Sequence, residues 1–256
     1  MDNWRKSMDK KFINLTIENI ESEHLCCAIS DKKHQMGVVA KKNWLKERII
    51  EGHVFRKLDE KGKVFIEYAP LETAWVPIYG NNYLYIYCLW VSGSFKGKGY
   101  AKSLIKYCIN DAKEKGKSGV CILSSKKKRP YLMDKKFLLK YGFKTVDVIK
   151  DEYELLALSF NGEKPYFSEK VKEMKIDNKE LTIYYTLQCP YVLNCIKEVT
   201  EYCSRNNILL SLKIVDTLEK AKNLPCIFNN WAVFYNGKYE TNHLLNETFL
   251  KKKFQL

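Results

Sequence analysis

Residues 83–101 read YLYIYCLWVSGSFKGKGYA. The first nine of these, which end at Val91, are aromatic, aliphatic or thiol-bearing, a composition typical of a strand in the middle of a sheet. Glycine then recurs at Gly93, Gly97 and Gly99, and glycine adopts loop conformations that other residues avoid. The stretch therefore predicts a central strand that leads into a glycine-rich loop.

The loop is followed by a pattern typical of an amphipathic helix. Apolar residues recur at steps of three and four over residues 101–114, and Gly116 stands where such a helix would end. Backbone N–H groups at the start of a helix are unsatisfied and lie at the positive end of its dipole. Because glycines let an anion approach these groups closely, we expect a pyrophosphate site. Its residues are Lys96, Gly97, Lys98, Gly99, Tyr100 and Ala101.

Two other nucleotide-binding motifs do not fit this loop. A P-loop needs a longer glycine spacing and a Gly-Lys pair followed by Ser or Thr, whereas Gly99 follows Lys98 here. A dinucleotide-binding fingerprint needs a third glycine at position 102, which is Lys102. Both classes are therefore excluded for this loop.

The segments around the loop predict the rest of a mixed α/β domain. Lys61-Gly62 is a turn signal between two short strand patterns, which together favour a hairpin. Strand, loop, helix and strand follow one another as in a βαβ crossover. Strands are predicted over residues 12–20, 53–58, 63–68, 120–123 and 143–149, and helices over residues 37–50 and 131–140, the latter after Pro130.

The loop resembles the signature of the Gcn5-related N-acetyltransferase (GNAT) superfamily. That signature is Arg or Gln, two residues, Gly, one residue, and Gly or Ala, and Lys96 stands here at its first position. Gly142-Phe143 is similar to the closing Gly-Phe turn of the family. The resemblance covers about residues 12–160. It implies a mixed-sheet α/β (α+β) fold and acetyl-CoA as the acyl-donor substrate.

The resemblance also implies a reaction and a place for it. In the family an amine attacks the acetyl thioester directly, in a ternary complex. The implied thioester site comprises Leu89, Trp90 and Val91, where the carbonyl is bonded by backbone N–H groups. We expect the cofactor strand to splay from its neighbour there, since bulges near active sites free such groups.

Proton transfer needs a base, because a protonated amine is not a nucleophile. Glu67, late in the strand next to the cofactor strand, is the first candidate, and Glu72 is the reserve. A carboxylate beside a partly apolar aromatic cleft can have a raised pKa. The alternative for Glu67 is an exposed or salt-bridged strand residue.

The proton donor for the departing thiolate is harder to place. Many relatives use a tyrosine four residues before the Gly of the Gly-Phe turn, and this chain has Leu138 there. Tyr131, at the start of the same predicted helix, and Tyr141 are the substitutes; the alternative for both is a packing role. We take Glu67 and Tyr131 as the catalytic candidates.

A second domain is expected after a turn-rich, charged linker. The predicted boundaries are residues 1–160 for the GNAT domain, 161–178 for the linker and 179–256 for the second domain. Its predicted elements follow the order βαβαββα, which is that of a thioredoxin-like core. Together with this order, Gln188-Cys189-Pro190 and the Asn236-Gly237-Lys238 hairpin resemble the YoaP-like domain, which is found behind acetyltransferase domains. The resemblance covers about residues 165–256.

Three cysteines of the second domain stand at chemically suggestive positions. Cys189 precedes a predicted helix, where the thiolate is favoured, but Cys195 comes too late for a dithiol pair. Pro225-Cys226 falls where thioredoxin-like folds commonly carry a cis-proline that faces the reactive thiol. Cys189 and Cys226 meeting across a cleft would suit a soft metal, a metalloid or a mixed disulfide. The alternative is that all three are buried structural thiols.

The amino-acid composition of the chain narrows the classes of partner and the cellular location to be expected. A net charge of +14 favours anionic partners, but the run from Lys126 to Arg129 lacks interleaved aromatic residues, so nucleic acid is not favoured over a solvated loop. The N-terminus has no apolar signal segment, and no apolar run is long enough to span a bilayer. Nine cysteines are an odd number without an export signal, so reduced thiols and a cytoplasmic location are expected.

These observations predict an acyltransferase that acetylates an amine of a small molecule or peptide. The alternative is a CoA-binding thiol sensor, or a metal- or metalloid-binding module, with little catalysis. No metal ligands are assigned. The acceptor amine and the oligomeric state stay open, because acceptor pockets vary on one fold.

Overall fold

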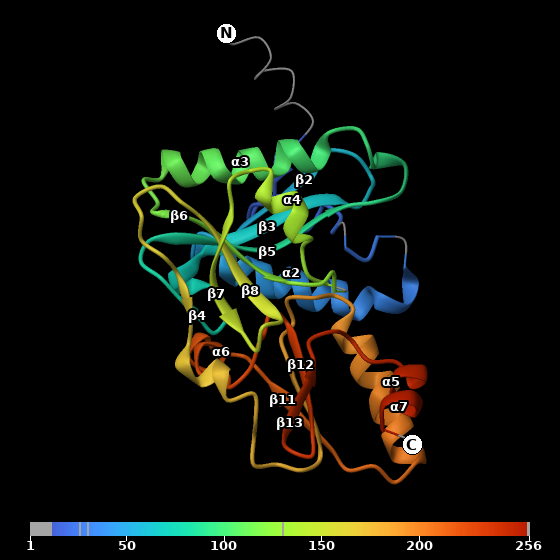
Figure 1. Cartoon of the computed structure of the whole chain (residues 1–256). Helices are drawn as coiled ribbons and strands as arrows, with labels where there is room; N and C mark the ends of the chain where they lie inside the picture. Colours follow the sequence, from blue (N-terminus) through green and yellow to red (C-terminus); the bar gives the residue numbers. More distant parts are fainter. Residues whose placement is uncertain (1–11, 26, 30, 130, 255–256) are drawn as a thin grey trace. The chain divides into compact units, whose positions relative to one another are not determined.

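The computed structural model describes residues 12–25, 27–29, 31–129 and 131–254 (Figure 1). The N-terminal residues 1–11 and Pro130, both used in the sequence analysis, lie outside the described residues. The chain divides into two compact units. The first draws its described residues from the spans 1–30, 42–74 and 79–166, and the second from the spans 31–41, 75–78 and 167–256. The two early spans 31–41 and 75–78 thus belong to the second unit.

The first unit is built on a mixed seven-stranded sheet, as expected for the fold class. Its only parallel pair is β5 with β6; the other neighbouring strands are antiparallel. In spatial order the strands are β1 Phe12–Asn14, β2 Val54–Leu58, β3 Val64–Pro70, β5 Tyr83–Val91, β6 Gly119–Ser125, β8 Tyr153–Ser159 and β7 Lys144–Ile149.

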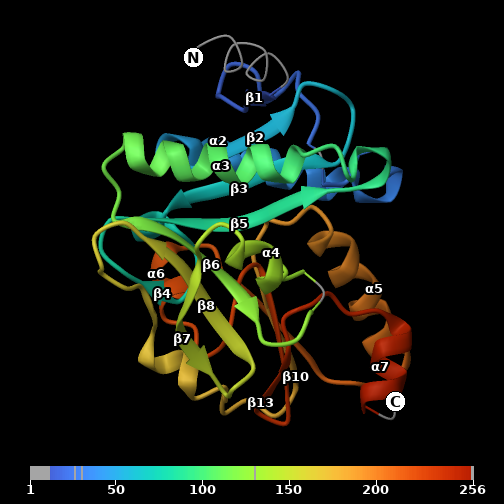
Figure 2. The ribbon, with the colours of Figure 1, turned by 45° about the horizontal axis from the view of Figure 1, so that its top comes forward.

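Helices lie on both faces of this sheet. Helix α3, Tyr100–Glu114, crosses one face over β3 and β5 (Figure 2), and residues 42–50 of α2, Gln35–Ile50, lie on the other. Helix α3 connects β5 to its parallel neighbour β6, which confirms the predicted crossover. Strand β7 does not lie beside β6, because β8, which the sequence patterns did not single out, pairs between them.

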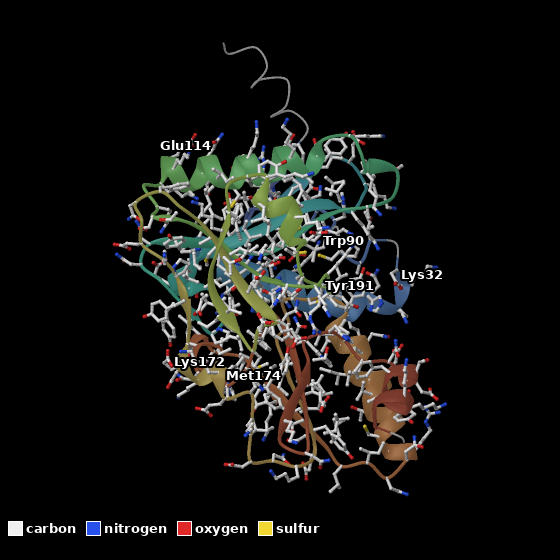
Figure 3. All side chains as sticks on the ribbon, viewed as in Figure 1. Lys32, Trp90, Glu114, Lys172, Met174 and Tyr191 are labelled. Carbon is white, nitrogen blue, oxygen red and sulfur yellow. The ribbon has the colours of Figure 1, made fainter. Side chains whose placement is uncertain are left out.

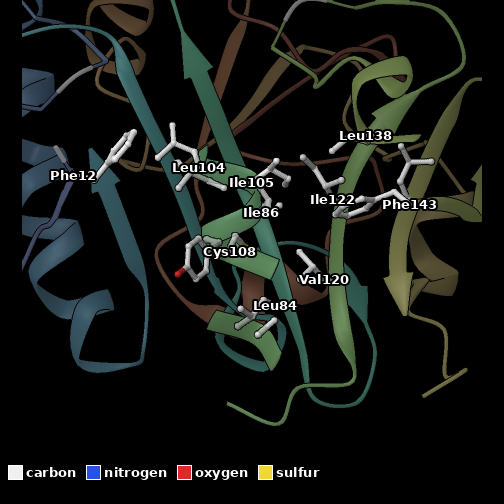
Figure 4. Packing of buried hydrophobic residues seen from close by; sticks show 14 of the residues in the cluster. Phe12, Leu84, Ile86, Leu104, Ile105, Cys108, Val120, Ile122, Leu138 and Phe143 are labelled. Atoms are coloured by element: carbon white, nitrogen blue, oxygen red, sulfur yellow. The ribbon is translucent and has the colours of Figure 1, made fainter. Parts of the chain in front are cut away.

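The core under α3 is formed by apolar side chains of the helix and the central strands. Figure 4 shows Leu104 and Ile105 of α3 close to Ile86 of β5. The Tyr68 hydroxyl, buried in β3, donates a hydrogen bond to the Asp111 carboxylate at 2.8 Å. The helix is thereby fixed to the sheet by packing and by a buried polar contact.

Two predicted elements of the first unit are wrong in extent. The predicted strand 12–20 ends at Asn14, because Thr16 and Asn19 form a turn in which Thr16 N–H donates to Asn19 Oδ1 at 2.8 Å. The predicted helix 131–140 is reduced to α4, Lys135–Leu139. Asp134 caps it by accepting from Lys136 N–H at 2.8 Å, and Tyr131 has a positive φ of 62°.

The second unit contains a four-stranded sheet. In spatial order its strands are β11 Leu210–Ile214, β10 Leu181–Tyr185, β12 Trp231–Tyr235 and β13 Lys238–Thr241. Its helices are α5 Val192–Arg205, α6 Leu218–Lys222 and α7 Glu247–Phe254. Along the chain this gives the expected βαβαββα order, while the thioredoxin-like assignment itself stays a prediction. The described residues contain no cis peptide bond, so the expectation of a cis-proline at Pro225 is wrong.

The segment predicted as a linker contains ordered structure. Strand β9, Tyr166–Phe167, and a 3-10 turn, Glu169–Lys172, lie within it. Phe167, Val171 and Met174 are almost fully buried. Although this stretch is rich in charged residues, three of its apolar side chains are thus buried.

The remaining elements are short. They are strand β4 Ile78–Tyr79 and the 3-10 turns Lys32–His34, Leu71–Thr73 and Gly93–Phe95. Among the residues that the structure describes, no helix has the length and apolarity needed to cross a membrane.

Candidate active site

The two central strands of the first unit part beside the glycine-rich loop. Strand β5 pairs with β6 only from Tyr83 to Ile86. Beyond Ile86, β5 stays paired with β3 as far as Val91, while β6 stays paired with β8 as far as Ser125. The edges of β5 and β6 that face each other are therefore open at this end of the sheet, as the expected splay requires.

A β-bulge lies where the strands part. The register of β3 against β5 shifts so that Glu67 is opposite Cys88 and Tyr68 is opposite Ile86. Tyr87 is the extra residue of β5. Bulges bend a strand and increase its twist, and this one turns β5 away from β6.

The alternation of backbone groups along β5 fixes which N–H groups face the gap. Ser92 N–H donates to the Lys63 carbonyl at 3.0 Å, so it faces β3. Successive N–H groups of a strand point to opposite sides, so those of Leu89 and Val91 point away from β3, toward the gap. Two N–H donors therefore face the gap, where either can bond a carbonyl oxygen.

The glycine-rich loop begins directly after these donors. Gly97 and Gly99 have φ angles of 77° and 80°, a region that favours glycine. A Cβ added at either one meets no described atom within 4 Å. Glycine is thus required here by the backbone conformation, and the space over the loop is open to a ligand.

Helix α3 begins at the end of the loop. Gly99 is its N-cap and offers no side-chain oxygen, so the first N–H groups of the helix have no capping side chain. Lys96 and Lys98 are exposed beside them. Figure 3 shows Trp90 at this end of α3 and Glu114 at its far end. The arrangement suits a phosphate-bearing ligand.

Glu67 lies on the opposite face of the sheet from α3, next to the bulge. Its carboxylate is fully buried, and its Oε1 lies 3.1 Å from Nε2 of His53, which is also buried. The His53 ring lies between Trp44 and Tyr87, with centroids 5.2 Å and 5.3 Å away. The aromatic rings thus pack around His53, and Glu67 has in this histidine a partner that the sequence patterns did not indicate.

The register of the β2–β3 hairpin accounts for the contact between His53 and Glu67. Phe55 pairs with Glu67, and His53 stands two residues before Phe55. Since side chains two apart in a strand share a face, His53 and Glu67 are on one face of the hairpin.

Comparison with known proteins identifies the family. The model of the "Acetyltransferase (GNAT) family" matches residues 17–132, and the model "YoaP-like" matches residues 210–252. A Bacillus subtilis (strain 168) protein named "Uncharacterized N-acetyltransferase YoaP" is 41% identical over 237 residues, which are 92% of this chain and 94% of that protein. The chain belongs to the GNAT acetyltransferase family. Its predicted class, an acyltransferase, is confirmed.

Solved structures of GNAT proteins are also similar to the chain. One is the PaiA N-acetyltransferase of Thermoplasma acidophilum in complex with coenzyme A, with 16% identity, a TM-score of 0.41, and coverage of 58% of this chain and 99% of that one. Another is a GNAT family acetyltransferase of Brucella melitensis in complex with acetyl-CoA, with 12% identity, a TM-score of 0.40, and coverage of 61% and 92%.

The other acid–base candidates of the GNAT domain have different surroundings. Tyr131 is 59% exposed and lies ahead of α4, not in it. Glu72 accepts a hydrogen bond from Asn82 N–H at 2.6 Å, which ties it to the turn before β5. Tyr141 packs on Phe137, with ring centroids 5.1 Å apart.

The first and last residues of the basic run Lys126 to Arg129 form local ion pairs. Lys126 Nζ lies 2.7 Å from the Asp151 carboxylate, and Arg129 pairs with Glu152. Both acidic residues lie in the turn between β7 and β8. These pairs favour a structural role in a solvated loop.

The thiols of the YoaP-like region differ in burial. The Cys195 thiol donates to the Leu245 carbonyl at 3.2 Å, and burial raises its pKa to about 12. Cys226 is fully buried, and burial raises its pKa as well, whereas Cys189 is half-buried. Across the described ranges, no group of three or more His, Cys, Asp and Glu side chains is arranged to hold a metal ion. These findings do not favour the sensor or metal-binding alternative.

Proposed function

We propose that the chain transfers the acetyl group of acetyl-CoA to an amine of a small molecule or peptide, by direct attack in a ternary complex. The observation that carries this proposal is the parting of β5 and β6 beside a glycine loop that opens α3. Family membership supports the same reaction class. We also propose that the protein works in the cytoplasm.

In this proposal the protein binds acetyl-CoA at two places, its pyrophosphate and its thioester. The pyrophosphate of acetyl-CoA lies on the N–H groups of the loop and the start of α3, and Lys96 and Lys98 add positive charge. The loop residues involved are Lys96, Gly97, Lys98, Gly99, Tyr100 and Ala101. The thioester carbonyl accepts a hydrogen bond from the N–H of Leu89 or Val91, with Trp90 between them paired to β3.

The chemistry then needs one proton acceptor and one proton donor. The amine nitrogen attacks the acetyl carbon, the C–N bond forms, and the C–S bond breaks with release of the CoA thiolate. Because Glu67 is fully buried, it takes the ammonium proton through water. Tyr131 gives a proton to the thiolate, since Leu138 has no proton to give and is buried in the core.

Acetyl-CoA binding tests the loop. Acetyl-CoA is expected to raise the Tm of the protein, and Gly99→Glu is expected to abolish that rise, because a carboxylate would occupy the anion site and repel the pyrophosphate. Gly116→Glu is the matched control: Gly116 also has a positive φ, 60°, and open space around it, but it lies at the other end of α3. Retained protection in Gly99→Glu would disprove the loop assignment.

Turnover tests the reaction. Release of CoA across a library of primary amines is expected to reveal an acceptor, and Glu67→Gln is expected to lower kcat with that acceptor by about 100-fold or more. Binding of acetyl-CoA is expected to survive this change, because Glu67 lies on the face of the sheet away from the loop helix. Cys189→Ser is the control and is expected to keep turnover, because no thiol of the protein takes part in the proposed step. Binding of acetyl-CoA without turnover of any amine would support the sensor alternative instead.

A further inference from the structure

Glu67 and His53 form a buried polar pair in the GNAT domain that the loop and the core do not require. Both side chains are almost fully excluded from solvent, and they meet at 3.1 Å. A buried carboxylate is unfavourable unless hydrogen-bond donors compensate it. Apolar residues would fill the same space with less penalty. A pair of this kind next to a strand gap therefore points to a chemical role.

The ring of His53 is held from two sides. Trp44 meets it edge-on, with an interplanar angle of 89°, and Tyr87 lies over it at an angle of 32°. Tyr87 is the extra residue of the bulge, so the histidine packs against the residue that turns β5 away from β6. This packing restricts the rotation of the imidazole and aims Nε2 at the carboxylate.

The pair is also close, along the sheet, to the proposed thioester site. Glu67 is opposite Cys88 in the register of β3 against β5. The next residue of β5 is Leu89, whose N–H faces the gap. The carboxylate is thus one residue step from one of the two N–H donors proposed to bond the carbonyl.

We propose that His53 is the positioning residue of Glu67: its Nε2–H donates to the carboxylate, fixes its orientation and keeps it ionised as the acceptor of the amine proton. An ionised carboxylate can only accept, so the nitrogen that faces it carries the hydrogen. The inference rests on the proposed function. In the transfer step the ammonium proton passes through water to Glu67, the C–N bond forms, the C–S bond breaks, and the thiolate leaves.

The elements packed around the pair carry further charged and titratable groups. On α2, Arg48 lies over the Trp44 ring at 6.0 Å and pairs with Glu47 and Glu51, each at 3.2 Å. On β5, burial raises the pKa of Tyr85, which stays a neutral phenol beside Tyr87. Cys88 is opposite Glu67. The polar contact on which the proposal rests is that of His53 Nε2 with Glu67 Oε1 at 3.1 Å.

Two substitutions separate positioning from packing. His53→Phe keeps a ring between Trp44 and Tyr87 but removes the donor, whereas His53→Gln keeps an N–H donor at a similar reach. Loss of a donor to the ionised form raises the pKa of a carboxylate. The acid limb of the kcat/KM profile is therefore expected to move to higher pH by about one unit in His53→Phe.

The other readouts follow from the same reasoning. His53→Gln is expected to keep the acid limb of the wild-type profile. Both variants are expected to keep the wild-type KM for acetyl-CoA, because the proposed pyrophosphate loop lies on the α3 side of the sheet, away from His53 and Glu67. A role in packing alone would lower the stability of both variants without moving the limb. An unchanged acid limb in folded His53→Phe overturns the proposal.

A second measurement needs neither turnover nor a folded His53→Phe variant. The chain has four histidines, so the 15N-imidazole signals of the wild-type protein are few, and the His53 signal is identified by its loss in His53→Gln. The expected form carries a hydrogen on Nε2; a neutral Nδ1–H tautomer overturns the proposal. Failure of wild-type acetyl-CoA binding or turnover would count against the proposed function instead, so the two failures are distinguishable.

Discussion

Leu138 shows how one residue shapes the chemistry of the GNAT domain. It stands where many relatives have a proton-donating tyrosine, and its side chain is fully buried in the core under α3 (Figure 4). A phenol at this position would have to enter a packed core and find a partner for its hydroxyl. The proton donor must therefore come from elsewhere, and Tyr131 is the residue we propose.

Thiol reactivity gives a prediction at this scale. Cys195, with a pKa raised to about 12 by burial, carries about one thiolate in ten thousand molecules at pH 8 and is expected to resist iodoacetamide. Half-buried Cys189 is expected to react before Cys195. Mass spectrometry of the alkylated peptides measures the order, with urea-unfolded protein as the control in which both react. Equal rates in the native protein would contradict the burial of Cys195.

At the scale of elements, the start of β6 decides how closely the central strands approach. Gly119 is opposite Tyr83 of β5 and Ser159 of β8. A Cβ at this position would lie 2.3 Å from the Leu158 carbonyl oxygen and 2.6 Å from the Tyr83 ring. Contacts this short cannot be kept, so a side chain here would push the strands apart below the site.

Gly119→Ala is accordingly expected to lower the free energy of unfolding by about 2 to 3 kcal/mol, through overpacking. Gly116→Ala is the control, because Gly116 has open space around it and a positive φ; its expected cost is about 1 kcal/mol from backbone strain alone. Urea denaturation of both variants measures the difference. A Gly119→Ala variant no less stable than Gly116→Ala would show that β6 accommodates the methyl group.

At the scale of the whole molecule, each unit is assembled from spans that are distant in sequence. Within the second unit, the His34 and Tyr191 rings lie 4.6 Å apart. Ser168 N–H donates to the Pro77 carbonyl at 2.9 Å, and the Lys222 ammonium donates to the Ile78 carbonyl at 2.9 Å. Residues of the spans 31–41 and 75–78 thus take part in its packing.

A fragment of residues 167–256 is therefore expected to unfold at lower urea concentration than the second unit of the full chain, because it lacks both spans. The matched control is full-length protein cut by a protease at a site inserted beside Gly162, an exposed turn residue, since this nicked chain keeps both spans. Far-UV circular dichroism measures the unfolding. Equal midpoints for the fragment and the nicked chain would show that the two spans contribute nothing.

Local patterns predicted most elements but not all of them. The strand Tyr83–Val91 has the predicted bounds, and α3 differs by one residue at its start. Their dense apolar spacing or clear turn signals leave few alternatives. The alternation over residues 12–20 was misleading, because Thr16 and Asn19 bond their own backbone in a turn. The helix at 131–140 was overextended because the cap at Asp134 was not recognised.

The sequence by itself determined the glycine loop, the strand before it, the helix after it and, through them, the family. These features are local, because glycine conformations, helix periodicity and strand composition depend on residues near one another in the chain. Only the tertiary structure decided the pairing of His53 with Glu67, the place of β8 between β6 and β7, and the burial of Phe167, Val171 and Met174. Partners and burial arise from contacts between distant segments, and no local pattern specifies which segments meet.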